Sequence, residues 1–188
     1  VLFGCLKLRT MVDDAEDWLL SDPDLRAMHK KNGFKLGLDQ DPRVTELGQL
    51  LRKTYLDELP QLMNVIRGDM SLVGPRPEVV EKMEELPTAY QKILELRPGI
   101  TDWGSIWNSD EGGVLEGTPD PDEAYEKILR PTKLKLQLHY CKTRNLVVDT
   151  KIIAHTLLRI VRKNWIPKEL REYPTFDQLR ANVETLIS

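Results

Sequence analysis

Two adjacent acids, Asp57 and Glu58, lie in the stretch LLRKTYLDELPQLMNVIRGDMSLVGPRPE, residues 50–78, with basic residues on both sides. Their types and spacing permit two interpretations. In the first, Thr54 caps a helix and Asp57 takes the third helical position of a capping box, so that both carboxylates face the positive end of the helix dipole. In the second, one carboxylate attacks a substrate or binds a metal ion while its neighbour handles a proton or a second ligand.

The second interpretation favours phosphoryl transfer over the other reactions that carboxylates support. Consecutive helical residues point about 100° apart, which is a poor arrangement for flanking a glycosidic bond from opposite faces. Arginine and lysine around a helix start are typical of a phosphate site, where a carboxylate would attack phosphorus and Mg²⁺ would neutralise charge. Acyl transfer lacks support, because the sequence has no Ser/His/Asp or Cys/His grouping, and His29, His139 and His155 are scattered.

The composition, net charge and cysteine count exclude several classes of protein. The 188 residues predict one domain, and the hydrophobic and charged fractions, 40% and 30%, are ordinary for a globular chain. A net charge of −3 argues against a general nucleic-acid binder. Cys5 and Cys141 are too few and too far apart for a disulfide framework or a zinc site, so we expect reduced thiols. The sequence shows no run of about 18 apolar residues and no signal peptide.

The hydrophobic pattern predicts a helix-rich α+β fold in a single domain. We expect a small β-hairpin or sheet, with strands over 1–12 and 103–107, and a polar loop over 108–123. The remaining periodic segments predict helices that end at glycines or are bounded by prolines. They comprise two short helices ending at Gly33, one around 47–51, one from Leu59 to a stop at Gly68, two between 74 and 101, and further helices over 122–129, 131–143, 149–163 and 176–187.

Three motifs resemble one known family. KLRTM at 7–11, the 37-residue block DPRVTELGQLLRKTYLDELPQLMNVIRGDMSLVGPRP at 41–77 and RPGIT at 97–101 resemble the bacterial sugar transferase family. These are the monotopic phosphoglycosyl transferases that start surface-glycan assembly. The resemblance extends from residue 1 to about residue 160, and the central block is its most specific part.

The resemblance implies a mechanism for the acid pair. Asp57 would attack the β-phosphate of a UDP-sugar, expel UMP and hold a covalent phosphosugar. Glu58 would assist Mg²⁺ binding or help activate the acceptor, a polyprenyl phosphate such as undecaprenyl phosphate, so both acids are candidate metal ligands. The implied phosphate-binding residues are basic side chains on turns and helix ends: Lys7, Arg9, Arg52, Arg76 and Arg97.

The sequence departs from the family pattern in two places. The sequence does not show the N-terminal hydrophobic segment of the family. Either the chain is truncated or it is a soluble variant, and we expect truncation. Many members continue differently after RPGIT, so Asp102, Asn108, Asp110 and Glu111 are candidates for nucleotide or sugar selectivity. A solvated acidic loop is an equally good explanation of those four residues.

The resemblance also implies a location and partners. The implied place is the cytoplasmic face of the bacterial inner membrane, with amphipathic helices lying at the membrane face, and other glycan-assembly enzymes are implied partners. Without its membrane segment the fragment would be soluble. Helix 149–163 has an amphipathic stripe and runs into a basic and aromatic stretch, 159–168, which is typical of a membrane interface. A stripe of this kind is more often explained by core packing.

Two other functions remain open at this stage. The first is a non-catalytic module of the same family that binds a nucleotide-sugar or a partner enzyme without turnover. The second is a generic anion-binding domain, which predicts no preference for uridine nucleotides and no effect of Mg²⁺.

Overall fold

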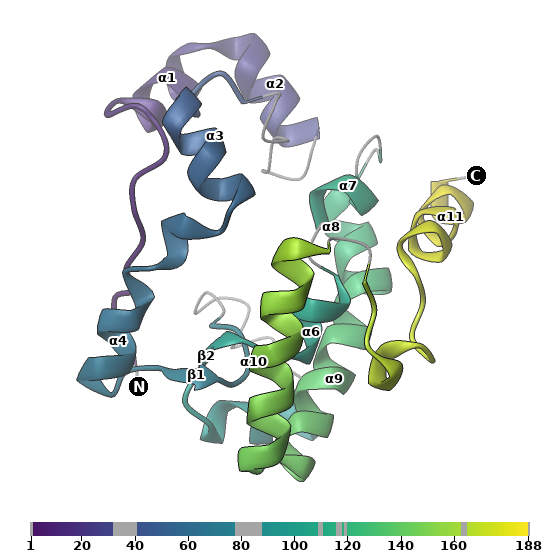
Figure 1. Ribbon diagram of the computed structural model, residues 1–188. Helices are drawn as coiled ribbons and strands as arrows, with labels where there is room; N and C mark the ends of the chain where they lie inside the picture. Colours follow the sequence, from purple (N-terminus) through teal and green to yellow (C-terminus); the bar gives the residue numbers. More distant parts are fainter. Residues whose placement is uncertain are drawn as a thin grey trace. The chain divides into compact units, whose positions relative to one another are not determined.

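The fold is helical with one small sheet, as the α+β prediction requires. The computed structural model describes residues 2–31, 41–77, 88–108, 111–115, 118, 120–162 and 165–187 (Figure 1). The chain forms two compact units. Unit 1 takes the described residues within Val1–Leu6, Gln61–Ser109 and Arg130–Pro174, and unit 2 takes those within Lys7–Pro60, Asp110–Leu129 and Thr175–Ser188.

Unit 1 contains the sheet, whose two strands are parallel. β1 (Ser71–Val73) pairs with β2 (Gly99–Thr101) in a register that places Ser71 opposite Gly99 and Val73 opposite Thr101. The expected small sheet is confirmed, but its hairpin alternative is wrong, because parallel strands cannot be joined by a tight turn and residues 74–98 lie between these two. The backbones approach so closely that a Cβ on Gly99 would overlap the backbone of Gly74.

The helices of unit 1 pack around α6 (Trp103–Trp107), which contacts α9 (Arg130–Thr143) and α10 (Leu146–Val161) (Figure 1). α4 (Gln61–Arg67) ends at Gly68, whose φ of 81° confirms the predicted stop, and η2 (Thr88–Glu95) precedes β2. The strand predicted over 103–107 is wrong. Asp102 caps a helix there by accepting a hydrogen bond from the Ser105 N–H at 2.7 Å, and four of its five residues are buried.

The segment after α10 completes unit 1. The His155 ring lies 5.9 Å from the Trp103 ring and 4.8 Å from the Trp165 ring, measured between centroids. The Trp107 indole N–H donates to the carbonyl of Pro174 at 2.9 Å. η4 (Lys168–Leu170) buries Leu170. Residues 165–174 are therefore an integral part of this core.

The amphipathic stripe of α10 is only partly buried. Ile152 is fully enclosed, whereas the side chains of Leu157 and Val161 are 60% and 82% exposed. Core packing therefore explains one side of the stripe, and membrane contact by the rest stays a prediction. Among the described residues, no helix combines the length and the apolar composition needed to cross a bilayer.

Unit 2 begins with an extended segment and three helices. Only one isolated antiparallel bridge, between Met11 and Val44, forms over residues 2–12, so the strand expected over 1–12 is wrong. The expected helix pair forms as α1 (Ala15–Ser21) and α2 (Pro23–Lys31). α3 (Glu46–Lys53) is capped by Thr45 and followed by the single turn η1 (Leu56–Glu58).

The other helices of unit 2 form a small apolar core. They are α7 (Glu111–Leu115), α8 (Pro121–Ala124), the wide turn η3 (Tyr125–Leu129) and α11 (Phe176–Ile187), and α11 contacts both α7 and η3. Val114 and Leu129 are fully buried. Pro131, which has no N–H to donate, lies in the first turn of α9 directly after η3. The helix predicted over 176–187 is confirmed. The loop predicted over 108–123 is wrong where α7 forms and where α8 begins, and residues 109, 110, 116, 117 and 119 of it lie outside the described residues.

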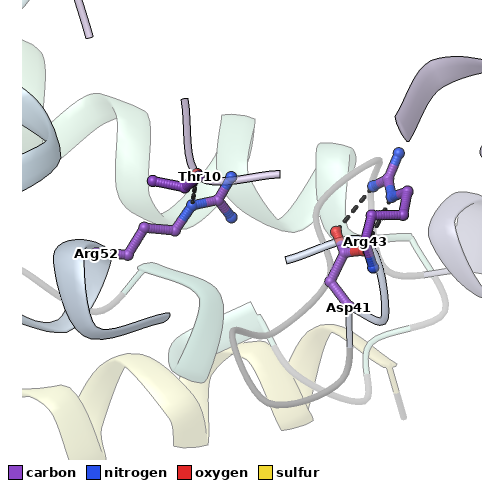
Figure 2. A network of polar contacts seen from close by, with 4 residues as sticks. All are labelled: Thr10, Asp41, Arg43 and Arg52. Atoms are coloured by element: carbon purple, nitrogen blue, oxygen red, sulfur yellow. Dashed lines mark hydrogen bonds and ion pairs between the residues drawn. The ribbon is translucent and has the colours of Figure 1, made fainter. Parts of the chain in front are cut away.

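A buried ion pair fixes the turn before α3 (Figure 2). The Arg43 side chain donates from Nε to Oδ1 and from Nη2 to Oδ2 of Asp41, both at 2.8 Å, and both residues are buried. Burial alone would raise the pKa of the Asp41 carboxyl, but the hydrogen bonds and charge of Arg43 lower it below its ordinary value.

We predict that Gly99→Ala destabilises the protein by about 1–3 kcal/mol, because the new methyl group has no space beside Gly74. Gly4→Ala is the matched control, because a Cβ at Gly4 meets no atom within 4 Å. Urea unfolding should separate the two variants, and equal midpoints would contradict the close packing of β1 against β2.

We predict that Asp41→Asn lowers the free energy of unfolding at pH 7 by about 3 kcal/mol, because it leaves the Arg43 charge buried and unpaired. A carboxyl with a lowered folded-state pKa stabilises the protein above its unfolded pKa and loses that effect as the pH falls. The difference from wild type should therefore shrink below about pH 4.

The control for that measurement is Glu123→Gln, which removes an exposed ion pair with Lys127. It should cost less than about 1 kcal/mol. Urea titrations between pH 3 and pH 7 test both variants, and a loss for Asp41→Asn that is independent of pH would contradict the assignment.

Candidate functional site

The acid pair does not belong to a capping box. Thr54 ends α3, where its hydroxyl donates to the Leu50 carbonyl at 2.7 Å, and Tyr55 turns the chain with a φ of 59°. Asp57 and Glu58 then fall in η1, a turn of three residues. The capping prediction is therefore wrong, because Thr54 closes the preceding helix and does not begin a new one. The two carboxylates need another explanation.

An open pocket of about 430 Å³ lies beside η1. Its wall combines residues 7–11 of the extended segment with one residue of α3 and one acid of η1, namely Lys7, Leu8, Arg9, Thr10, Met11, Arg52 and Asp57. The Leu8 N–H donates to the Asp57 carbonyl at 2.8 Å, which fixes the segment against η1. Four of the predicted site residues, three cations and the proposed nucleophile, therefore share one pocket.

The second acid is paired with a cation of the same site. Lys7 Nζ donates to Glu58 Oε1 at 2.8 Å, and the Glu58 side chain is 12% exposed. Arg9 pairs with Asp13, and both of those side chains are largely exposed. The two acids thus have different surroundings: Asp57 lines the pocket, and Glu58 is paired and mostly covered.

Arg52 is held by a hydroxyl group that the sequence did not single out. Its Nε donates to Thr10 Oγ1 at 2.8 Å, and the dashed line in Figure 2 ends on Nε, so this bond uses neither terminal nitrogen. The two residues are 42 positions apart. No local sequence motif connects positions so far apart. The only signal in the sequence was that Thr10 belongs to the KLRTM motif.

Arg76 and Arg97 belong to unit 1, where the sheet brings their turns together. The Gly99 N–H donates to the Pro75 carbonyl at 2.9 Å, so the Gly-Pro-Arg-Pro and Arg-Pro-Gly turns lie side by side. Arg76 is half-buried and Arg97 is exposed. These two cations form one group within unit 1, and Lys7, Arg9 and Arg52 form another within unit 2.

The residues proposed for sugar selectivity have different environments. Asp102 is 1% exposed, caps α6 and accepts a hydrogen bond from Gln137 Nε2 at 3.3 Å, so helix capping explains it without a substrate. Asn108 ends α6 and is 6% exposed. Asp110 lies outside the described residues, and Glu111 begins α7.

Two adjacent carboxylates fit the Mg²⁺ that the family resemblance implies. Mg²⁺ commonly takes one or two carboxylates and completes its shell with phosphate and water oxygens. Asp57 at the pocket and its neighbour Glu58 offer that donor set. In the part of the chain that the structure describes, no three His, Cys, Asp or Glu side chains form a metal-binding group, so phosphate or water oxygens would have to supply the other ligands.

A second, smaller pocket of about 130 Å³ lies in unit 1. It is lined by residues of α6, α9, α10 and the segment that follows α10, among them Trp103, His139, Lys151, Glu169 and Tyr173. It contains none of the side chains that the sequence proposed for phosphate or metal binding.

Comparison with known proteins finds relatives that match most of this chain. The chain is 36% identical to the exopolysaccharide production protein ExoY of Sinorhizobium fredii, over 82% of this chain and 62% of that protein. It is 37% identical to the undecaprenyl-phosphate galactose phosphotransferase of Salmonella typhimurium, over 87% of this chain and 31% of the relative. It is 38% identical to the UDP-glucose:undecaprenyl-phosphate glucose-1-phosphate transferase of Escherichia coli K12, over 72% of this chain and 27% of the relative.

The chain spans less than two thirds of the length of each of these relatives. The family model described as bacterial sugar transferase matches residues 1–163, which is most of the chain. The chain therefore belongs to the bacterial sugar transferase family.

Proposed function

We propose that this chain is the catalytic domain of a phosphoglycosyl transferase that moves a sugar-1-phosphate from a UDP-sugar to a polyprenyl phosphate. The observation that carries the proposal is the open pocket in which Asp57 lies among Lys7, Arg9 and Arg52. A carboxylate among cations can attack phosphorus, because the cations offset the repulsion between two anions. The printed names of the Salmonella and Escherichia coli relatives support the choice of donor and acceptor.

The first step forms an aspartyl phosphosugar. An oxygen of the Asp57 carboxylate attacks the β-phosphorus of the donor, and a bond forms between that oxygen and phosphorus. The bond from the β-phosphorus to the oxygen that bridges the two phosphates breaks, and UMP leaves with that oxygen. The guanidinium groups and the ammonium of the pocket are suited to the two phosphates, because arginine can bind phosphate oxygens through two N–H groups at once.

The second step returns the enzyme to its starting state. A phosphate oxygen of the polyprenyl phosphate attacks the phosphorus of the phosphosugar, and the bond to Asp57 breaks. The product is a polyprenyl-diphosphate sugar, and the Asp57 carboxylate is free again. Because the acceptor is a lipid, this step would take place at the membrane surface, on its cytoplasmic face. Other glycan-assembly enzymes would then use the product.

Glu58 and Lys7 have supporting roles in this proposal. Their 2.8 Å pair leaves Asp57 as the acid that lines the pocket. Glu58 would bind Mg²⁺ together with Asp57 when the donor is present. The bound ion would supply charge neutralisation on the transferring phosphate. The family resemblance implies that Arg76 and Arg97 also bind phosphate groups, from turns that proline makes rigid.

We predict that incubation with Mg²⁺ and the correct UDP-sugar adds the mass of one phosphosugar to the protein. Intact-mass spectrometry across a panel of UDP-sugars tests this. Asp57→Asn should show no increase, because an amide is a far poorer nucleophile than a carboxylate. Asp17→Asn, which changes an exposed acid of α1 in the same way, is the matched control and should label like wild type.

A labelled Asp57→Asn variant would contradict the assignment of the nucleophile. A wild-type protein that binds UDP-sugars but gains no mass with any of them would contradict the covalent mechanism. That second result would favour the non-catalytic binding module.

We predict that chelation with EDTA abolishes the mass increase and that added Mg²⁺ restores it, because the phosphate charge must be neutralised during transfer. Glu58→Gln should require a higher Mg²⁺ concentration for half-maximal labelling, by about tenfold. The labelling rate is measured against Mg²⁺ concentration for both proteins. Labelling that is unchanged by EDTA would rule out the metal requirement.

A further inference from the structure

The contact between Arg52 and Thr10 has features of a positioning device. The Thr10 hydroxyl accepts a hydrogen bond from Arg52 Nε at 2.8 Å, and Thr10 is only 6% exposed (Figure 2). Both residues line the pocket that contains Asp57. An arginine side chain has many rotamers, so a buried partner on Nε removes much of the freedom that binding would otherwise have to remove.

Thr10 is itself held firmly in place. Its carbonyl accepts hydrogen bonds from the Thr45 N–H at 3.1 Å and from the Thr45 hydroxyl at 3.3 Å. Gly48 lies so close that a Cβ there would overlap the same carbonyl. One residue of the extended segment is thus fixed against the first turn of α3, and Arg52 lies on the last turn of that helix.

The geometry leaves the phosphate-binding end of Arg52 available to a ligand. Nε is the nitrogen that donates to Thr10, so this hydrogen bond uses neither of the two terminal nitrogens (Figure 2). The N–H groups of the two terminal nitrogens of a guanidinium can donate to two oxygens of one phosphate at once, because their spacing matches.

We propose that Thr10 is a positioning residue, which orients the Arg52 guanidinium so that its terminal nitrogens bind the diphosphate of the donor. This inference rests on the proposed function in naming the donor, but it concerns the chain's own residues. Thr10 touches no reacting atom and acts through Arg52. The competing explanation is that the bond only ties the extended segment to α3, in which case its loss would affect stability and leave the preference for diphosphates unchanged.

The test is a double-mutant cycle on ligand binding by isothermal titration calorimetry, with UDP and inorganic pyrophosphate as probes. Thr10→Val keeps the shape of the side chain and removes the hydroxyl, so it should weaken the binding of both probes by roughly tenfold. Thr10→Ser keeps the hydroxyl and should stay within about twofold of wild type. Arg52→Ala should weaken binding by more than Thr10→Val does.

The decisive comparison is Thr10→Val in the Arg52→Ala background, where it should cost less than about twofold, because the residue through which Thr10 acts is gone. An equal loss in both backgrounds would overturn the proposal, and so would unchanged binding by Thr10→Val. Urea unfolding of every variant shows how much folded protein enters each titration. If Thr10→Val does not fold, Arg52→Lys replaces it: lysine retains the charge but not the planar fork, so it should bind about tenfold more weakly than wild type, and wild-type affinity would overturn the proposal.

Failure of this proposal differs from failure of the proposed function. A wild-type protein that binds pyrophosphate as tightly as UDP contradicts a uridine donor, while the cycle with pyrophosphate still tests Thr10. A wild-type protein that binds neither probe overturns both.

Discussion

The site depends on a set of backbone hydrogen bonds that hold residues 8–12 against the segments around α3. The N–H groups of Leu8 and Val12 donate to the carbonyls of Asp57 and Arg43, and Thr10 accepts from the Thr45 N–H between them. These bonds join segments more than 30 positions apart, so neither segment could form the pocket alone. The cations of the pocket repel one another, so they do not draw these segments together. The backbone hydrogen bonds, which involve no net charge, hold the segments in place despite that repulsion.

The residues of the site were more predictable than its geometry. The residue types of the acid pair and its cations favour phosphoryl transfer, which stays a prediction, and the structure brings four of those residues into one pocket. The capping box was wrong, because a threonine between two helical segments can end the first or begin the second, and local sequence does not distinguish them. The Thr10–Arg52 bond links positions 42 residues apart, so only the folded chain reveals it.

The long helices were predictable and the sheet was not. The apolar spacing of α10 and α11 repeats over several turns, which gives a strong signal. The strands contain three residues each, too few for an alternation of apolar and polar residues to identify a strand. Their pairing also depends on the close approach of Gly74 and Gly99, which are 25 positions apart. Residues 103–107 alternate like a strand but form a helix, because Asp102 caps it and the packing with α9 and α10 buries most of its faces.

The packing of residues 165–174 sets a boundary for exchanging domains between relatives. The family model ends at residue 163, whereas Trp165 lies beside His155 and Pro174 accepts the Trp107 indole N–H. A hybrid protein joined at residue 163 would therefore pair α6 and α10 with a foreign covering segment. Substitutions in that segment and on those helices must be compatible with one another, so recombination between homologues should succeed more often when residues 165–174 come from the same parent as α6 and α10.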